Sequence, residues 1–202
     1  MIRIDRAVSL GTTCETAFQL RRVFGKHNCV SGVFDFQVTP PETVIEYLRR
    51  DFVGLFEYDD FIVKDGIVQN RRFGTQHMHE FRSGNIDRDF VGARSRHDHL
   101  CGNMRVALKG NGALLLAATL PPERLALANE IKHLVRDRNC DLVFSLEVLK
   151  RRQGPDLIAN WQGDNHQWDC ALSKYRGRPE GLTPYLNRQV KRFASHVVSG
   201  KF

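Results

Sequence analysis

The stretch that decides the fold runs from Ala113 to Leu146 and reads ALLLAATLPPERLALANEIKHLVRDRNCDLVFSL. Its first part, Ala113–Ala118, is a continuous apolar run, typical of a strand that is covered on both faces of a sheet. Pro121-Pro122-Glu123 predicts a helix start, and Leu142–Leu146 predicts a second buried strand. A strand, a helix and a strand within about 35 residues predict two parallel strands that are joined by a right-handed crossover.

The beginning of the chain supports the same fold class. Residues Ala7–Leu10 predict a short buried strand, and Thr13–Phe24 predicts a helix after a glycine turn. We therefore expect an α/β fold, with a single mostly parallel sheet flanked by helices in three layers, of the Rossmann/flavodoxin or SGNH-like type. Asp65-Gly66 lies between β-branched runs and predicts a small β-hairpin insertion. Neither repeats nor a linker interrupts the chain, so residues 1–202 are expected to form one α/β domain.

Three more segments carry local patterns. Thr39 and Glu42 form a second capping box, which predicts a helix to about Arg50 with Pro40 at its first position. Helical spacing of apolar residues predicts a helix over Asp89–Leu108. An apolar stripe with basic residues on the other side predicts an amphipathic helix over Thr183–Val198.

Charge and composition limit the possible partners. The chain has 202 residues and a net charge of +7, and the whole excess of Lys and Arg falls in residues 101–202. Such asymmetry allows an anionic partner at the basic C-terminal half. No apolar run reaches the roughly 18 residues of a membrane span, and the N-terminus lacks the pattern of an export signal, so a cytoplasmic protein is expected. The five cysteines have no CxxC spacing, so reduced thiols are expected, with no metal and no cofactor.

The residues around Cys14 predict a reactive thiol. Thr12 suits the N-cap of the first helix, and Glu15 completes a capping box three residues later. This register places Cys14 at the second helical position, where free N–H groups and the helix dipole favour a thiolate. The alternative is that Cys14 is a small buried residue without chemistry.

Acidic and histidine residues that could act with a thiol occur further along the chain. Asp35 lies between Phe34 and Phe36, so it needs a polar or cationic partner if it is buried. His77 and His79 would point the same way on a strand, and either could serve as a general base. Together with His97 and His99 they allow a metal site, but their spacing matches no strong metal signature. A polar loop is expected over Trp161–Asp169, and it contains Asp164 and His166.

Three of these blocks occur together in a known family. The sequence Ser9-Leu10-Gly11-Thr12-Thr13-Cys14, followed by a helix with two arginines, resembles the opening of the papain-like cysteine peptidases of the DUF1796 class. Val33-Phe34-Asp35-Phe36 is similar to that family's Pro-Phe-Asp-Trp block, and His79-Glu80-Phe81 is similar to its His-Asp-Phe block. Here Val33, Phe36 and Glu80 replace the proline, the tryptophan and the second aspartate. The resemblance covers about residues 5–150.

The resemblance implies a role for each of three residues. Cys14 would be the nucleophile, His79 the base that deprotonates it, and Asp35 the carboxylate that orients the base. Backbone N–H groups of Thr13 and Cys14 could form an oxyanion hole. An SGNH-like sheet would instead bring an acid and a base from near the C-terminus, which are Asp164 and His166 in this chain.

The leading hypothesis is therefore a cysteine-dependent hydrolase or acyltransferase that acts on a peptide, ester or thioester. The alternative is a non-catalytic binding module that uses the basic C-terminal helix for an anionic partner such as nucleic acid or a membrane surface. A sugar- or nucleotide-modifying enzyme that binds its substrate through Asp35, Arg94 and Arg96 is a third possibility, although no phosphate-binding glycine loop is present.

Overall fold

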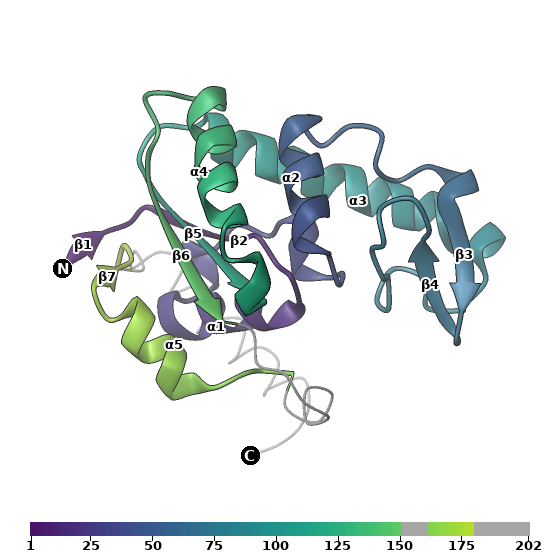
Figure 1. Cartoon of the computed structure of the whole chain (residues 1–202), viewed down its shortest axis with the longest axis horizontal. Coiled ribbons are helices and arrows are strands. Elements are labelled where there is room, and N and C mark those ends of the chain that lie inside the picture. The colour runs from purple at the N-terminus through teal and green to yellow at the C-terminus, as the bar shows by residue number, and fades with distance from the viewer. Residues whose placement is uncertain (151–160, 180–202) are drawn as a thin grey trace, which may run out of the picture.

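A parallel three-stranded sheet forms the centre of the molecule (Figure 1). The computed structural model describes residues 1–150 and 161–179. Strands β2 (Arg6–Ser9), β5 (Ala113–Leu120) and β6 (Val143–Lys150) lie in the order β2-β5-β6, and both pairs are parallel. The expected crossover unit is thus confirmed, with β5 as its central strand.

Side chains of β5 alternate between two hydrophobic cores. Leu114 and Leu116 point into the larger core, whereas Leu115 and Ala117 point into the smaller one, and all four are at most 1% exposed. In register with them, Val8 of β2 enters the larger core and Ala7 the smaller one. A strand that is apolar on both faces needs cover on both faces, which explains the helical layers on either side.

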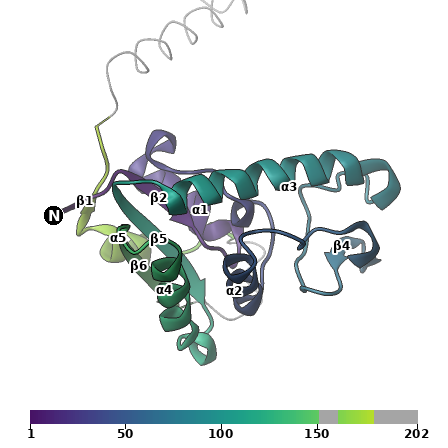
Figure 2. The ribbon, with the colours of Figure 1, turned by 90° about the horizontal axis from the view of Figure 1, so that it is seen from above.

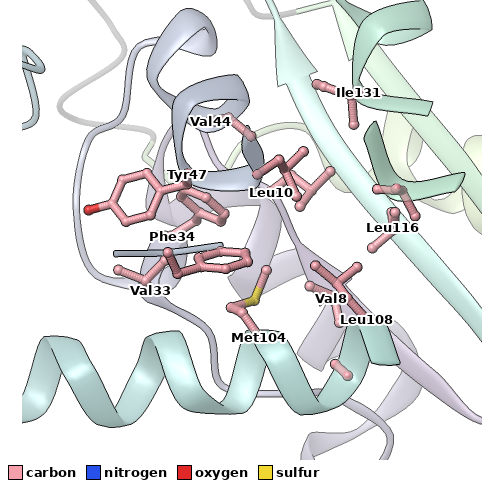
Figure 3. Packing of buried hydrophobic residues seen from close by; sticks show 14 of the residues in the cluster. Val8, Leu10, Val33, Phe34, Val44, Tyr47, Met104, Leu108, Leu116 and Ile131 are labelled. Atoms are coloured by element: carbon pink, nitrogen blue, oxygen red, sulfur yellow. The ribbon is translucent and has the colours of Figure 1, made fainter. Parts of the chain in front are cut away.

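The helices divide between the two faces (Figures 1 and 2). The larger core is closed by α2 (Pro41–Arg49), α3 (Ile86–Lys109) and α4 (Leu127–Arg138), and α4 is the crossover between β5 and β6. Figure 3 shows Phe34 and Tyr47 packed with Met104 in this core. The smaller core lies under α1 (Cys14–Phe24) and α5 (Asn165–Leu172). The three-layer α/β arrangement is therefore confirmed.

The hairpin insertion is also present. Strands β3 (Phe61–Lys64) and β4 (Ile67–Asn70) pair antiparallel, and Asp65 and Gly66 between them both have positive φ, the signature of a type I′ turn. The hairpin lies against the N-terminal part of α3, away from the parallel sheet (Figures 1 and 2). A separate aromatic cluster around Phe56 packs beneath it.

Short elements complete the described part of the chain. Strand β1 (Ile2–Arg3) pairs in parallel with β7 (Tyr175–Arg176). Short 3₁₀ turns occur in the connecting segments, and these are η1 (Lys26–Asn28), η2 (Val33–Asp35), η3 (Tyr58–Asp60) and η4 (Pro122–Arg124). None of the described helices is both long and apolar enough to cross a membrane.

Several sequence expectations need correction. The polar loop expected over Trp161–Asp169 ends already at Asp164, because α5 begins at Asn165 with the Asp164 carboxylate accepting the N–H groups of His166 and Gln167. Helix α2 begins one residue later than expected, because Pro40 rather than Thr39 precedes it as the N-cap. The amphipathic helix expected over Thr183–Val198 lies outside the described residues.

Because β5 is the central strand, shortening one of its buried side chains should lower the free energy of unfolding more than shortening an exposed side chain of β6. Leu116→Ala should lower the free energy of unfolding by about 3 kcal/mol, because the removed atoms leave a cavity in the larger core. Val143→Ala on β6, which is 69% exposed, should cost less than about 1 kcal/mol. Urea denaturation followed by circular dichroism measures both values. Equal losses would contradict the assignment of β5 as the central buried strand.

Candidate active site

Cys14 lies where β2 ends and α1 begins, at the carboxyl edge of the parallel sheet. The chain leaves β2 into α1 on the face of the smaller core, whereas it leaves the neighbouring β5 towards α4 on the other face. Adjacent strands whose connections diverge in this way leave a crevice at their carboxyl ends, where ligands of α/β sheets bind. Cys14 therefore occupies a favourable place for chemistry.

The structure brings His79 to Cys14. The Cys14 Sγ atom is 3.9 Å from His79 Nε2, although the two residues are 65 positions apart in the chain. Two backbone contacts bring the segments together: Val38 N–H donates to Gln76 O at 3.0 Å, and Thr39 N–H donates to Thr12 O at 2.9 Å. The loop before α2 thus lies between the turn that carries His79 and the segment that leads to Cys14.

The local structure at Cys14 differs from the capping box expected from the sequence. Helix α1 starts at Cys14 itself, and the preceding Thr13 makes no side-chain cap. The Thr12 hydroxyl instead donates to Thr119 O on β5 at 3.1 Å. The Glu15 carboxylate accepts the indole N–H of Trp168 on α5 at 2.8 Å. Tertiary contacts have replaced the local cap, and they fix the thiol-bearing turn to β5 and to α5.

The pKa of the Cys14 thiol is higher than the sequence predicts. Burial raises the pKa of Cys14 above its ordinary value, and the carboxylates of Glu80 and Asp35 raise it further. The backbone N–H of Cys14 lowers the pKa, but this effect is smaller than that of burial. The expectation of a low-pKa thiolate is therefore wrong, because desolvation outweighs the helix N-terminus. A base is needed to remove the thiol proton.

Asp35 is buried beside the site but is paired with Arg21. Its side chain is 1% exposed, and it binds the Arg21 guanidinium and the backbone N–H of Gly32. Burial raises the pKa of Asp35 to about 6, although Arg21 and Gly32 act in the opposite direction. Arg21 lies two turns after Cys14 on α1, a spacing that indicates a shared helix face. Arg21 is the cationic partner that a buried Asp35 requires, and no sequence pattern around Asp35 points to it.

The expectation that His77 and His79 point the same way on a strand is wrong. His77 follows an isolated bridge residue and is buried, whereas His79 lies in a turn and is exposed. The His77 Nε2 atom is 2.8 Å from Thr75 Oγ1, and its Nδ1 atom is 3.7 Å from Glu80 Oε2. The buried His77–Glu80 pair is not predicted from the sequence, since three-residue spacing alone does not show which side chains point inwards.

The second predicted acid and base belong to α5. Asp164 caps that helix, and His166 lies 3.8 Å from Cys170 Sγ one turn further on. Arg94 and Arg96, the arginines of the third hypothesis, also contact other side chains of the protein. Arg94 binds Glu57 and Asp98, whereas the Arg96 guanidinium lies 4.5 Å from the centre of the Phe36 ring.

Within residues 1–150 and 161–179, no three His, Cys, Asp or Glu side chains lie close enough together to bind a metal ion.

The buried ion pair predicts a pH-dependent stability effect. Arg21→Gln should lower the free energy of unfolding by about 3 kcal/mol at pH 8, because it leaves the Asp35 carboxylate buried and uncompensated. The cost should shrink towards pH 5. The pKa of Asp35 in the folded protein is raised to about 6, so at pH 5 the carboxyl is largely protonated and stabilises the folded state. This stabilisation is lost as the pH rises through about 6 and the carboxylate forms.

Denaturation at the two pH values tests this prediction, with Arg21→Gln/Asp35→Asn as the matched control. The double variant should regain part of the loss at pH 8. A pH-independent cost of Arg21→Gln would show that packing, rather than the ion pair, determines the effect.

Comparison with known proteins adds no assignment to this geometry. No family model, no curated protein and no solved structure matches the chain.

Proposed function

We propose that the protein is a cysteine-dependent hydrolase or acyltransferase, with Cys14 as the nucleophile and His79 as the general base. The observation that carries the proposal is the 3.9 Å contact between the Cys14 thiol and His79 Nε2 at the carboxyl edge of the sheet. Catalytic contacts are often longer without substrate and shorten in the reacting complex. The order of the three blocks that resemble the papain-like cysteine peptidases supports the same assignment, and we propose kinship with that family.

The chemistry follows from the state of the thiol. His79 Nε2 takes the proton from Cys14 Sγ, and the sulfur attacks the carbonyl carbon of a peptide, ester or thioester. Backbone N–H groups at the start of α1 face the developing oxyanion. The bond to the leaving group then breaks, the leaving group takes the proton from the imidazolium, and an acyl-thioester remains on Cys14. Water completes hydrolysis, whereas an amine, alcohol or thiol completes acyl transfer.

Asp35 and His166, two other residues predicted to act with the thiol, are not reacting groups in this mechanism. Asp35 is proposed to shape the site through its ion pair with Arg21, since its contacts run to Arg21 and Gly32. The His166 ring lies next to another thiol, with its Nδ1 atom 3.8 Å from Cys170 Sγ. We therefore keep Cys14 and His79 as the two reacting groups.

Alkylation by iodoacetamide tests the dyad. Cys14 should react in a manner that depends on His79: His79→Gln should slow the modification of Cys14 near neutral pH by at least about tenfold, because the base for a thiol of raised pKa is lost. Peptide mass spectrometry across pH 5–10 gives the rate for each cysteine separately. An activated thioester should leave an acyl group on Cys14 in the wild type but none at this position in Cys14→Ser.

Cys170 supplies an internal control. It is exposed and lies at a similar distance from a histidine, so it reports what simple Cys–His proximity achieves. His166→Gln should leave both Cys14 alkylation and acylation unchanged. The proposal fails if Cys14 is alkylated at the same rate with and without His79, or if it reacts no differently from Cys170.

A further inference from the structure

Two aromatic side chains near the start of α1 form a pair outside the hydrophobic cores. The rings of Phe18 and Trp161 contact each other edge to face, with their centres 5.2 Å apart and an interplanar angle of 68°. Phe18 is half-buried and Trp161 is 49% exposed, and neither is part of the clusters around β5 or of the cluster around Phe56. The pair is therefore accessible to a ligand, and aromatic side chains commonly line ligand sites.

Phe18 lies one turn after Cys14 on the same face of α1. Residues four apart in an α-helix have Cβ atoms about 5–6 Å from each other. Helical side chains also tilt towards the N-terminus of their helix, so the Phe18 ring covers the turn that carries Cys14. Because Trp161 contacts this ring, the aromatic pair lies next to the thiol.

The segment that carries Trp161 is fixed to the same part of α1. The Gln19 side chain donates from Nε2 to Gln162 O at 2.6 Å. Gly163 has a φ of 78° and packs so closely on the Glu15 carboxylate that no Cβ atom would fit there. Trp161 is therefore held beside α1 in the free protein, which lowers the entropic cost of binding a ligand against it.

The leaving group and the acyl group of a substrate extend in different directions from the reacting carbon. His79 returns its proton to the leaving group in the proposed mechanism, so the leaving group lies on the side of His79. The segment with His79 follows the β3–β4 hairpin, whereas Trp161 precedes α5, and the hairpin and α5 lie towards opposite ends of the molecule (Figures 1 and 2). The aromatic pair is thus placed to contact the acyl group.

The charges around the aromatic pair favour an uncharged ligand group. Phe36, the aromatic ring next to Asp35, has the guanidinium groups of Arg21 and Arg96 over it, at 5.9 and 4.5 Å from the ring centre. In the part of the chain that the structure describes, no Arg or Lys side chain lies over Phe18 or Trp161 in this way. The indole surface that remains exposed is therefore suited to an apolar, uncharged group.

We propose that Phe18 and Trp161 form the subsite for the acyl group of the substrate, and that this group carries an aromatic ring. The inference rests on the proposed function and deepens it, because it names the class of acyl group that Cys14 accepts. A substrate ring against the exposed indole gains the buried area and the preferred geometry of an aromatic pair. Phe18 and Trp161 determine specificity in this scheme and take no part in proton transfer.

Acylation of Cys14 by two thioesters that share one leaving group tests the subsite. Each rate is measured by mass spectrometry in a single turnover and divided by the rate with glutathione, a thiol without a subsite. The wild type should then prefer a phenylacetyl over an acetyl thioester by about tenfold. Trp161→Ala should remove this preference by slowing phenylacetylation about tenfold. It should leave acetylation and the alkylation of Cys14 by iodoacetamide unchanged.

Three further variants separate ring contact from damage to the fold. Trp161→Phe retains an aromatic ring and should recover most of the phenylacetylation rate. Phe18→Leu keeps an apolar side chain but removes the ring on which Trp161 packs, so it should lower the same rate several-fold. Tyr58→Ala removes another exposed aromatic ring, which packs on Phe90 beside the hairpin, and it should change neither rate.

Tryptophan fluorescence supplies a measurement of binding that needs no reaction. The chain has two tryptophans, and Trp168 is fully buried whereas Trp161 is exposed. Titration of Cys14→Ala with the phenylacetyl thioester should change the emission in a saturable manner, because the ligand covers the Trp161 indole. The same titration of Cys14→Ala/Trp161→Phe should give no such change.

The two proposals fail separately. Equal phenylacetyl and acetyl rates, or a phenylacetyl rate that Trp161→Ala leaves unchanged, would overturn the subsite while Cys14 still reacts through His79. A cyclohexylacetyl thioester that reacts as fast as the phenylacetyl thioester would overturn the preference for an aromatic ring. A saturable fluorescence change without acylation of Cys14 by any thioester would instead overturn the proposed function.

Discussion

The burial of β5 on both faces is the constraint from which the rest of the molecule follows. A strand whose alternating side chains all enter a core needs helices above and below it, so α1 and α4 must lie on opposite faces. Because α1 follows β2 and α4 follows β5, the two neighbouring strands send the chain in opposite directions at their carboxyl ends. Cys14 lies at this point of divergence, the place at which open α/β sheets commonly bind ligands.

Desolvation has the largest effect on the pKa of Cys14 and of Asp35. Burial raises the pKa of both Cys14 and Asp35, against the helix N-terminus in one case and against a guanidinium in the other. The site thus holds a protonated thiol with a histidine beside it, which differs from a thiolate that is prepared in advance. The proposed mechanism therefore depends on its base, and with it on the position of the turn that carries His79.

The sequence predicts those features that depend on local patterns. Apolar runs located β5 and β6, Asp65-Gly66 located the hairpin turn, and the short motifs led to Cys14 and His79 as candidates. Features that depend on tertiary contacts were missed. Glu15 was expected to cap α1, but it binds Trp168, a residue 153 positions away on a helix that was expected to be a loop. No pattern near Glu15 contains that information.

The segment with His77 and His79 shows why the candidate site cannot be assembled from the sequence pattern alone. His77 and His79 are equivalent in the sequence, yet the first is buried against Thr75 and Glu80, and the second faces the thiol. The segment stays hydrogen-bonded to β4 as far as His77, whose N–H donates to Val68 O at 2.9 Å, and the turn that follows carries His79 to Cys14. One extended segment would have kept both rings together and allowed a metal site. The turn instead separates an inner imidazole that pairs with a carboxylate from an outer imidazole that reaches Cys14.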